Sequence, residues 1–283
     1  MTRAVQVTEV CSEHGEGPVW WAGWPGLRWV DMLAGDLLTL GADGSVARRH
    51  LGTVLAALRP RSGGGMVIAL ECGFALVDED WSVRSLGDLW ADPGVRMNDG
   101  GCDPDGRFYC GSMAYASGPG RGSLYRLDTG GSSRVVLGGV TVSNGLAWSP
   151  DGSTAYYVDS ATRRVDAFDY DPERGLSGRR PAVKVDPPAG IPDGLTVDDE
   201  GHLWVALHGG GAVHRYRADG RLDGRVEVPV SQVTACTFGG PRLDQLYITT
   251  SRLDRGPAAE PGAGALFRAD VGITGLPAAA FGG

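Results

Sequence analysis

The stretch Asp103-Pro104-Asp105-Gly106-Arg107-Phe108-Tyr109-Cys110 places a polar turn directly before a short aromatic strand. The same arrangement, a turn rich in Gly or Asp followed by a β-branched or aromatic run, occurs six times along the chain. The six runs are Leu27–Val30, Met66–Ala69, Arg107–Cys110, Ala155–Val158, His202–Val205 and Gln245–Ile248. Their central residues recur every 39 to 48 residues. A period of roughly 40 to 50 residues is typical of one β-propeller blade, so the repeat predicts six blades.

Each run is flanked by further strands. A second strand follows it, as in Ala212–Tyr216, where the character of the side chains alternates as on a strand with two different faces. A more apolar strand precedes it, as in Gly145–Trp148. With one outer strand, each repeat makes a four-stranded blade. We therefore expect an all-β fold, a six-bladed β-propeller of four-stranded blades, with residues 1–283 forming a single domain.

The two ends of the chain and one insertion carry separate expectations. Val5–Val10 alternates like a strand, and we expect it to pair as the outer strand of the last blade, because closing the ring removes open strand edges. The Pro-, Gly- and Ala-rich segment Arg255–Gly264 interrupts the last blade and is predicted to be a surface loop. The small, apolar tail Gly275–Gly283 is predicted to be frayed.

Composition and charge exclude several classes of protein. The chain has 46 glycines and 17 prolines in 283 residues and no clear helical stripe, which suits short strands joined by tight turns. The formal net charge of −8 disfavours binding to nucleic acid or to anionic membranes. Eight Trp and eight Tyr residues, placed periodically, exclude a disordered chain.

The cysteines and the N-terminal residues indicate the cellular compartment of the protein. The five cysteines are widely spaced and form no Cys-x-x-Cys pair, which is typical of free thiols in a reducing cytoplasm. Met1–Val5 has no apolar signal core, and no apolar run approaches about 18 residues. We expect a cytoplasmic protein. A propeller of this size is self-sufficient, so we expect a monomer, with a weak homodimer as the alternative.

Four repeats carry an oxygen-bearing side chain 11 to 13 residues before the central residue of the run. These four are Glu16, Asn98, Asn144 and Asp193. Asn-Gly and Asp-Gly are also common turn formers, so any one of the four could be purely structural. Four occurrences at one register, one of them Glu-Gly-Pro, favour side chains that converge on the propeller axis instead.

The chemistry of this set favours a hard cation. Two carboxylates and two amides, with no suitably placed His or Cys, are the ligands that such cations prefer. Ca²⁺ is the first choice, with Mg²⁺, Mn²⁺, Zn²⁺ or Fe²⁺ as alternatives. If only Glu16, Asn144 and Asp193 bind the ion directly, positions stay open for water and substrate, as catalysis requires.

Several segments together resemble the SMP-30/gluconolactonase/regucalcin family, in the same order and over nearly the whole chain. They are Glu16–Trp20, Arg96–Gly100, Asp103–Arg107, Ser143–Ser149, Pro192–Gly194 and Thr237–Gly240. The resemblance implies a six-bladed propeller with one divalent cation that acts on sugar lactones.

The resemblance also implies roles for individual residues. Glu16, Asn144 and Asp193 match the metal ligands of the family, and Asp193 also matches the residue proposed as the base. Arg96 and Asn98 match its substrate-contacting positions.

Two further site residues and an alternative base come from the chain itself. Asp99 is the alternative base. Regucalcin-like members carry acidic residues after the stretch that corresponds to Gly111–Met113, whereas this chain has Ala114-Tyr115-Ala116. Other groups must therefore read the substrate hydroxyls, and Tyr115 is a candidate. His208, after the inner half of the fifth blade, is a second candidate contact at the rim.

These observations lead to one main functional hypothesis and two alternatives. The main one is a metal-dependent lactonase in which water attacks the ring ester of a sugar lactone, a small-molecule partner. One alternative is a related metal-dependent hydrolase of phosphotriesters or aromatic esters. The other is a propeller that binds calcium or a protein without turnover, although Arg96 and open metal positions are not needed for that role.

Overall fold

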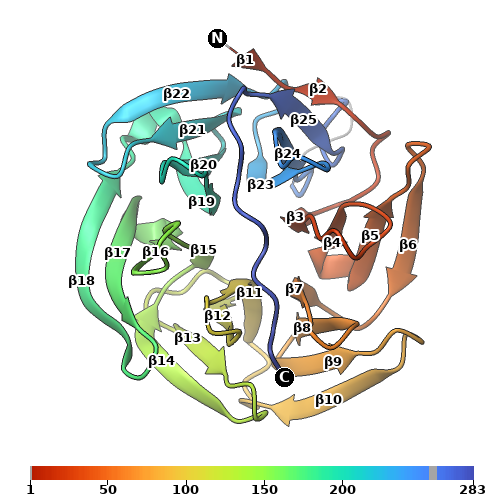
Figure 1. The fold of residues 1–283 in the computed structure, drawn as a ribbon, viewed down its shortest axis with the longest axis vertical. Coiled ribbons are helices and arrows are strands. Elements are labelled where there is room, and N and C mark those ends of the chain that lie inside the picture. The colour runs from red at the N-terminus through yellow and green to blue at the C-terminus, as the bar shows by residue number, and fades with distance from the viewer. Residues whose placement is uncertain (1, 255–259) are drawn as a thin grey trace.

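The computed structural model describes residues 2–254 and 260–283. Six sheets, antiparallel except for one added N-terminal strand, are arranged radially around a central axis (Figure 1). The predicted all-β, six-bladed propeller is confirmed. The blades are numbered in chain order. The innermost strand of each, here called the inner strand, comes first in sequence, except that two strands from the N-terminus add outermost strands to the last two blades.

The first three blades follow one another directly. Blade 1 contains β3 (Gly15–Val19), β4 (Arg28–Asp31), β5 (Asp36–Leu40) and β6 (Val46–His50). Blade 2 contains β7 (Leu55–Pro60), β8 (Met66–Leu70), β9 (Gly73–Val77) and β10 (Val83–Asp88). Blade 3 contains β11 (Val95–Cys102), β12 (Phe108–Ala114), β13 (Gly122–Leu127) and β14 (Ser133–Val140).

The last three blades include the N-terminal residues. Blade 4 contains β15 (Ser143–Trp148), β16 (Thr154–Asp159), β17 (Arg164–Asp171) and β18 (Gly175–Lys184). Blade 5 contains β19 (Ile191–Val197), β20 (Leu203–His208), β21 (Ala212–Tyr216), β22 (Leu222–Glu227) and β1 (Thr2–Arg3). Blade 6 contains β23 (Val233–Gly239), β24 (Gln245–Thr250), β25 (Phe267–Asp270) and β2 (Val5–Gln6).

Helical structure is limited to three short 3₁₀ turns in the described part of the chain. They are η1 (Met32–Ala34), η2 (Ser160–Thr162) and η3 (Pro187–Ala189). None of these is long and apolar enough to cross a membrane.

The N-terminal residues join two blades. Val5 pairs with Arg268, so β2 is the outer antiparallel strand of blade 6, as predicted for the start of Val5–Val10. The observed strand is shorter than predicted and stops at Gln6. Unexpectedly, Thr2 pairs in parallel with Val226 and adds a fifth strand to blade 5.

The prediction of a frayed tail is wrong. Residues 275–283 cross the middle of the ring (Figure 1), and Phe281 is only 1% exposed within the core around blades 1 to 3. The Phe281 amide donates to the Pro60 carbonyl at 2.8 Å, and the Gly282 amide donates to the Gly106 carbonyl at 2.9 Å. The tail is ordered because its apolar residues cover the apolar ends of the inner strands.

The predicted surface loop Arg255–Gly264 lies partly outside the described residues. In its described part Ala263 and Gly264 are buried, and the Gly264 carbonyl accepts hydrogen bonds from the amides of Cys11 and Ser12. This end of the segment therefore packs against the first residues of the chain rather than extending into solvent.

The inner strands define two faces. They contact one another in a closed ring, begin at what is here called the entrance face, and end at the tail face, which the C-terminal residues cross. At the tail face the channel widens into a cavity of about 440 Å³, lined by Val19, Cys102 and Phe238 and covered by residues 276–279. The predicted site residues of the inner strands lie towards the entrance face instead.

Candidate active site and metal centre

A β-bulge interrupts every inner strand close to where it begins. In β3 the pairing register shifts between Glu16 and Val19, and in β19 it shifts between Pro192 and Leu195. Equivalent shifts occur in the other four inner strands. A bulge places two residues of one strand opposite one of its partner and re-aims a side chain. The bulges explain how residues within strands can point along the channel axis.

Glycines beside the site residues let neighbouring inner strands approach closely. A Cβ atom on Gly145 would lie 2.5 Å from the amide nitrogen of Leu195 and 2.9 Å from the carbonyl oxygen of Asp193. A Cβ atom on Gly194 would lie 2.5 Å from the Cβ atom of Ala235. The Asn-Gly and Asp-Gly pairs are therefore needed for packing around the axis as well as for local geometry.

Three carboxylates are buried together at the entrance end of the channel: Glu16, Asp99 and Asp193. Burial raises the pKa of Glu16 well above its ordinary value, and the charges of Asp193 and Asp99 raise it further. Burial and the charge of Asp99 likewise raise the pKa of Asp193. The Oδ1 atom of Asp193 is buried and has no hydrogen-bond partner.

This arrangement fits a divalent cation. Three buried carboxylates repel one another, and an opposite charge between them favours their ionised forms. All the donor atoms of Glu16, Asn144 and Asp193 that could reach an ion are oxygens, which suits Ca²⁺ and other hard cations. The Oδ1 atom of Asp193 has no hydrogen-bond partner and is therefore available to bind such an ion.

A chain of hydrogen bonds holds the two amides. Asn98 Nδ2 donates to the Ser143 carbonyl at 2.7 Å and to Asn144 Oδ1 at 3.1 Å. Asn144 Nδ2 donates to Ser160 Oγ at 2.8 Å, and Ser160 Oγ donates to the Pro192 carbonyl at 2.6 Å. Blades 3, 4 and 5 are thus connected next to Asp193. Ser160 lies in η2, and no sequence pattern singled it out.

Arg96 is buried beside this network. Its Nη1 atom donates to Asn98 Oδ1 at 2.6 Å and to the Met97 carbonyl at 2.9 Å. Its Nε atom is buried without a partner. The guanidinium carbon lies 5.6 Å from the centre of the Tyr115 ring. Arg96 therefore joins the amide network to the exposed rim of the site.

Tyr115 brings in an acidic residue that sequence reasoning missed. Tyr115 is 45% exposed, and its hydroxyl donates to Glu71 Oε1 at 2.6 Å. Burial and the neighbouring Glu71 carboxylate raise the pKa of Tyr115 to about 12. Glu71 lies between β8 and β9 of blade 2. Blade 3 has no acidic residue after Met113, where regucalcin-like proteins carry one. The folded ring places Glu71 of blade 2 next to this position.

Two histidines lie at the same entrance. His14 Nδ1 is 2.8 Å from Ser251 Oγ, and His14 Nε2 is 3.9 Å from Glu16 Oε1. Burial, together with the charges of Arg96 and His208, lowers the pKa of His14 to about 3. His14 is therefore neutral at physiological pH. His208 is half-buried at the end of β20 and forms an isolated β-bridge with Gln232.

The structure brings the predicted site residues together. Electrostatic coupling links Glu16, Asp99 and Asp193 to one another and to Arg96. Hydrogen bonds link Arg96 to Asn98 and Asn98 to Asn144. Tyr115 lies over Arg96, and the charge of His208 influences His14. Their roles in binding and catalysis stay predictions.

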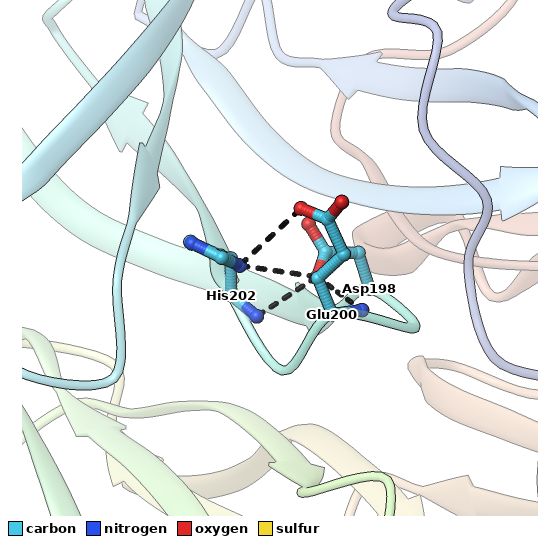
Figure 2. Close-up of side chains that lie close together, drawn as sticks. All are labelled: Asp198, Glu200 and His202. Carbon is cyan, nitrogen blue, oxygen red and sulfur yellow. Dashed lines mark hydrogen bonds and ion pairs between the residues drawn. The ribbon is translucent and has the colours of Figure 1, made fainter.

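A second acidic group lies in the turn between β19 and β20. Figure 2 shows Asp198, Glu200 and His202 together there, with ligand atoms within 4.8 Å of one another. Arg215 already balances the two carboxylates: its Nε atom donates to Asp198 Oδ2 at 2.8 Å, and its Nη2 atom pairs with Glu200. Trp204 Nε1 also donates to Asp198 Oδ2 at 2.8 Å. This group is an ion-pair network, and the axial carboxylates are the better candidate for a metal.

The site and fold agree with a known family. A family model described as the SMP-30/gluconolactonase/LRE-like region matches residues 14–252. The chain belongs to this family. The matched region includes the axial residues from Glu16 to Asp193 and excludes β1, β2 and the C-terminal tail.

Members of the SMP-30/gluconolactonase/LRE-like family resemble the chain over almost its full length. A pentonolactonase of Haloferax volcanii is 37% identical over 283 residues, which cover 96% of each chain. Regucalcin of Danio rerio is 36% identical over 282 residues, which cover 94% of each chain. Among solved structures, a calcium-binding protein, regucalcin, from Agrobacterium tumefaciens superposes with a TM-score of 0.93 at 29% identity, covering 99% of this chain and 97% of that one.

Proposed function

We propose that the protein is a lactonase that hydrolyses a sugar lactone, with a divalent cation held by Glu16, Asn144 and Asp193. The observation that carries this proposal is the buried group of three carboxylates, one with an unpartnered oxygen, at the entrance of the channel. The similarity to a pentonolactonase supports the substrate class.

The ion is proposed from the donor set. Oxygen donors favour Ca²⁺, and Mg²⁺, Mn²⁺, Zn²⁺ or Fe²⁺ are the alternatives. The similarity to a solved calcium-binding regucalcin also supports Ca²⁺ as the first choice among these cations. When bound, the cation supplies a Lewis acid that polarises the carbonyl of the ring ester.

The residues of the chain supply a base and positioning. Asp193, with Asp99 as the alternative, accepts the proton of the attacking water. The new carbon–oxygen bond forms, the ring carbon–oxygen bond breaks, and the proton passes to the departing ring oxygen. An ionised carboxylate next to the attacking water can accept the proton and return it in this way.

Substrate hydroxyls are read by the rim of the site. The Nε atom of Arg96 has no hydrogen-bond partner in the protein. The planar guanidinium group is suited to donate hydrogen bonds to substrate hydroxyls or to a developing oxyanion. Asn98 and His208 are the further contacts. Tyr115 and Glu71, joined by a 2.6 Å hydrogen bond, present a phenol and a carboxylate to the sugar ring.

The test is lactone hydrolysis followed with a pH indicator. Metal-stripped protein is reloaded with each of the five cations and given five- and six-membered aldonolactones, with phosphotriesters and aromatic esters alongside. Asp193→Ala should lower turnover about a thousandfold or more. Asp270→Ala, an exposed carboxylate on β25, is the matched control and should leave turnover unchanged.

The outcomes separate the alternatives. Turnover that returns with metal and disappears in Asp193→Ala supports the lactonase proposal. Turnover that survives complete chelation contradicts the metal requirement. Saturable Ca²⁺ binding without hydrolysis of any ester would favour the non-catalytic calcium-binding role.

We further infer a cytoplasmic location and a monomeric state. All five cysteines are free, as in proteins of reducing compartments. Sedimentation over a range of concentrations distinguishes a monomer from a weak homodimer.

A further inference from the structure

A second cleft lies between blades 1 and 2, away from the axial carboxylates. Its volume is about 320 Å³, and it is formed by three hairpin turns, around Trp24, Gly64 and Trp81. The turn around Gly64 belongs to the tail face, because its neighbour Arg61 pairs with Phe281. The cleft is therefore at the opposite face from the proposed lactone site.

A buried arginine without a counter-charge lines this cleft. Arg28 is only 8% exposed, and in the described part of the chain its guanidinium donates only to Met66 Sδ, at 3.2 Å. Its Nε atom is buried without a partner. No carboxylate among the described residues forms an ion pair with it. Burial lowers the pKa of Arg28 to about 10, so the group is still charged at neutral pH.

Two indole rings hold this cation. The Arg28 guanidinium carbon lies 4.4 Å from the centre of the Trp24 ring and 5.2 Å from that of Trp81. Desolvating an unpaired ion is costly, and a cation–π contact recovers only part of that cost. A thioether is a weak acceptor, and a guanidinium has five donors to satisfy. The protein contacts therefore offset only part of the cost, and an anion in the cleft would supply the rest.

Trp81 lies beside Arg28 in an unfavourable backbone conformation. Its φ angle is +69°, in the left-handed region that is unfavourable for an L-residue with a Cβ atom. Its ring also lies 4.2 Å from the guanidinium carbon of Arg49. Strained positions of bulky residues are concentrated at binding sites, where the side chain has to be in one place.

We propose that this cleft binds a small organic carboxylate with a flat apolar face, its carboxylate on Arg28 and its flat face against the indole rings. The volume is at the small end of ligand pockets, which suits a ligand of monosaccharide size. Asp78 at the rim is paired with Arg61 at 2.7 Å, and Glu79 is exposed. These rim carboxylates disfavour polyanions such as phosphates and favour a ligand with a single negative charge.

Aromatic carboxylates have this chemistry, since they combine a single negative charge with a flat apolar face. The experiment is calorimetric titration of the metal-loaded, full-length protein with benzoate and indole-3-acetate. Acetate, gluconate and xylonate lack the flat face and glucose lacks the charge, so these four serve as ligand controls.

We expect at least one of the two aromatic carboxylates to bind saturably, with a dissociation constant of about 1 mM or lower. Arg28→Gln should weaken that binding at least about tenfold, because the carboxylate loses a charged, two-pronged partner. Arg84→Gln, an exposed arginine on β10 of blade 2, is the matched control and should bind like the unaltered protein. Lactone hydrolysis should be the same in both variants.

A second variant keeps the test decisive if Arg28→Gln folds poorly. Trp24→Leu retains Arg28 and removes one flat wall, and it should also weaken binding. Circular dichroism verifies the fold of each variant. Weaker binding of acetate, gluconate and xylonate than of the aromatic carboxylates supports the role of the flat face. The proposal is overturned if neither aromatic carboxylate binds, or if folded Arg28→Gln and Trp24→Leu bind it as tightly as the unaltered protein.

Discussion

A single hydroxyl group, that of Ser160, connects two blades at the proposed metal site. It accepts a hydrogen bond from Asn144 Nδ2 at 2.8 Å and donates one to the Pro192 carbonyl at 2.6 Å, next to Asp193. At the scale of residues, side chains that would never touch the ion therefore decide how its ligands are presented.

Ser160→Ala should weaken metal binding about 10–100-fold, because partners of metal ligands typically contribute that much. Calorimetric titration of the metal-stripped protein with Ca²⁺ measures the effect. Ser132→Ala, an exposed serine before β14, is the matched control. Unchanged affinity in a folded Ser160→Ala variant would contradict the positioning role.

The pair formed by Tyr115 and Glu71 should act on substrate binding. Hydrogen bonds to charged groups contribute about 1.5–3 kcal/mol, so Glu71→Gln should raise KM for hydroxylated lactones roughly 10–100-fold. Because the carboxylate is remote from the ester, kcat should change less. Tyr115→Phe and the double variant complete a cycle, and their effects should be non-additive because the two side chains are 2.6 Å apart.

Steady-state kinetics on lactones with and without ring hydroxyls makes this measurement. Glu173→Gln, an exposed glutamate after β17, is the control. A fall in kcat with an unchanged KM would show that the pair does not read the substrate hydroxyls.

At the scale of elements, the inner strands combine a bulge with a glycine. The register shift in β15 lies between Ser143 and Leu146, and Gly145 within it touches the backbone of β19. The bulge re-aims the side chain of Asn144, and the glycine lets the neighbouring strand come close enough for Asp193 to reach the same proposed ion site.

Gly145→Ala should therefore damage both stability and the site. The added Cβ would lie 2.5 Å from the Leu195 amide nitrogen, and overpacking of this kind costs typically 1–3 kcal/mol. Denaturant unfolding measures the loss of stability, and Ca²⁺ titration measures the loss of affinity. Gly138→Ala is the matched control, because a Cβ there meets nothing within 4 Å. Equal behaviour of the two variants would argue against close packing of β15 and β19.

At the scale of the whole molecule, six blades contribute to one site and the ends of the chain secure the ring. β1 and β2 join blades 5 and 6, and the tail carries Phe281 into the core at the other face. The same ring forces three carboxylates into one buried space, where their pKa values are raised. The metal-free ring is therefore under electrostatic strain that grows with pH.

The stabilisation that a divalent cation provides should increase as the pH rises above the ordinary pKa values of carboxyl groups, which are about 4. Carboxyl groups with raised pKa values in the folded state stabilise it at low pH, and that contribution is lost as the pH rises through those values. A bound cation replaces the protons, so it helps most where they are absent. The lowered pKa values of His14 and His214 work in the opposite direction.

Comparing chelated and Ca²⁺-loaded protein at each pH cancels the contribution of the histidines. The difference in melting temperature between the two forms is the measurement. Asp193→Asn should reduce both this difference and its dependence on pH. A difference that shrinks towards high pH would contradict the prediction.

Much of the fold was readable from the sequence. Turn chemistry and strand periodicity are local properties, so the repeat around Tyr109 and its equivalents indicated six blades. The register of Glu16, Asn98, Asn144 and Asp193 could be counted along the chain because each residue occupies the same position in its own blade. The resemblance to a family came from the same segments.

Contacts between blades could not be read in this way. Glu71 reaches Tyr115 and Ser160 reaches Pro192 from neighbouring blades, and sequence distance says nothing about such pairs. The tail looked frayed because small apolar residues have no periodicity, yet Phe281 is buried.

The number of blades, the strands within them and the register of the axial oxygen-bearing side chains were predictable from the sequence, because they follow from short-range turns and strand periodicity. The path of the tail, the partners of the site residues and the unpaired burial of Arg28 became evident only in the folded ring. Those features arise when the ring closes and brings distant surfaces into contact, and the free energy of that packing is not encoded in any one segment.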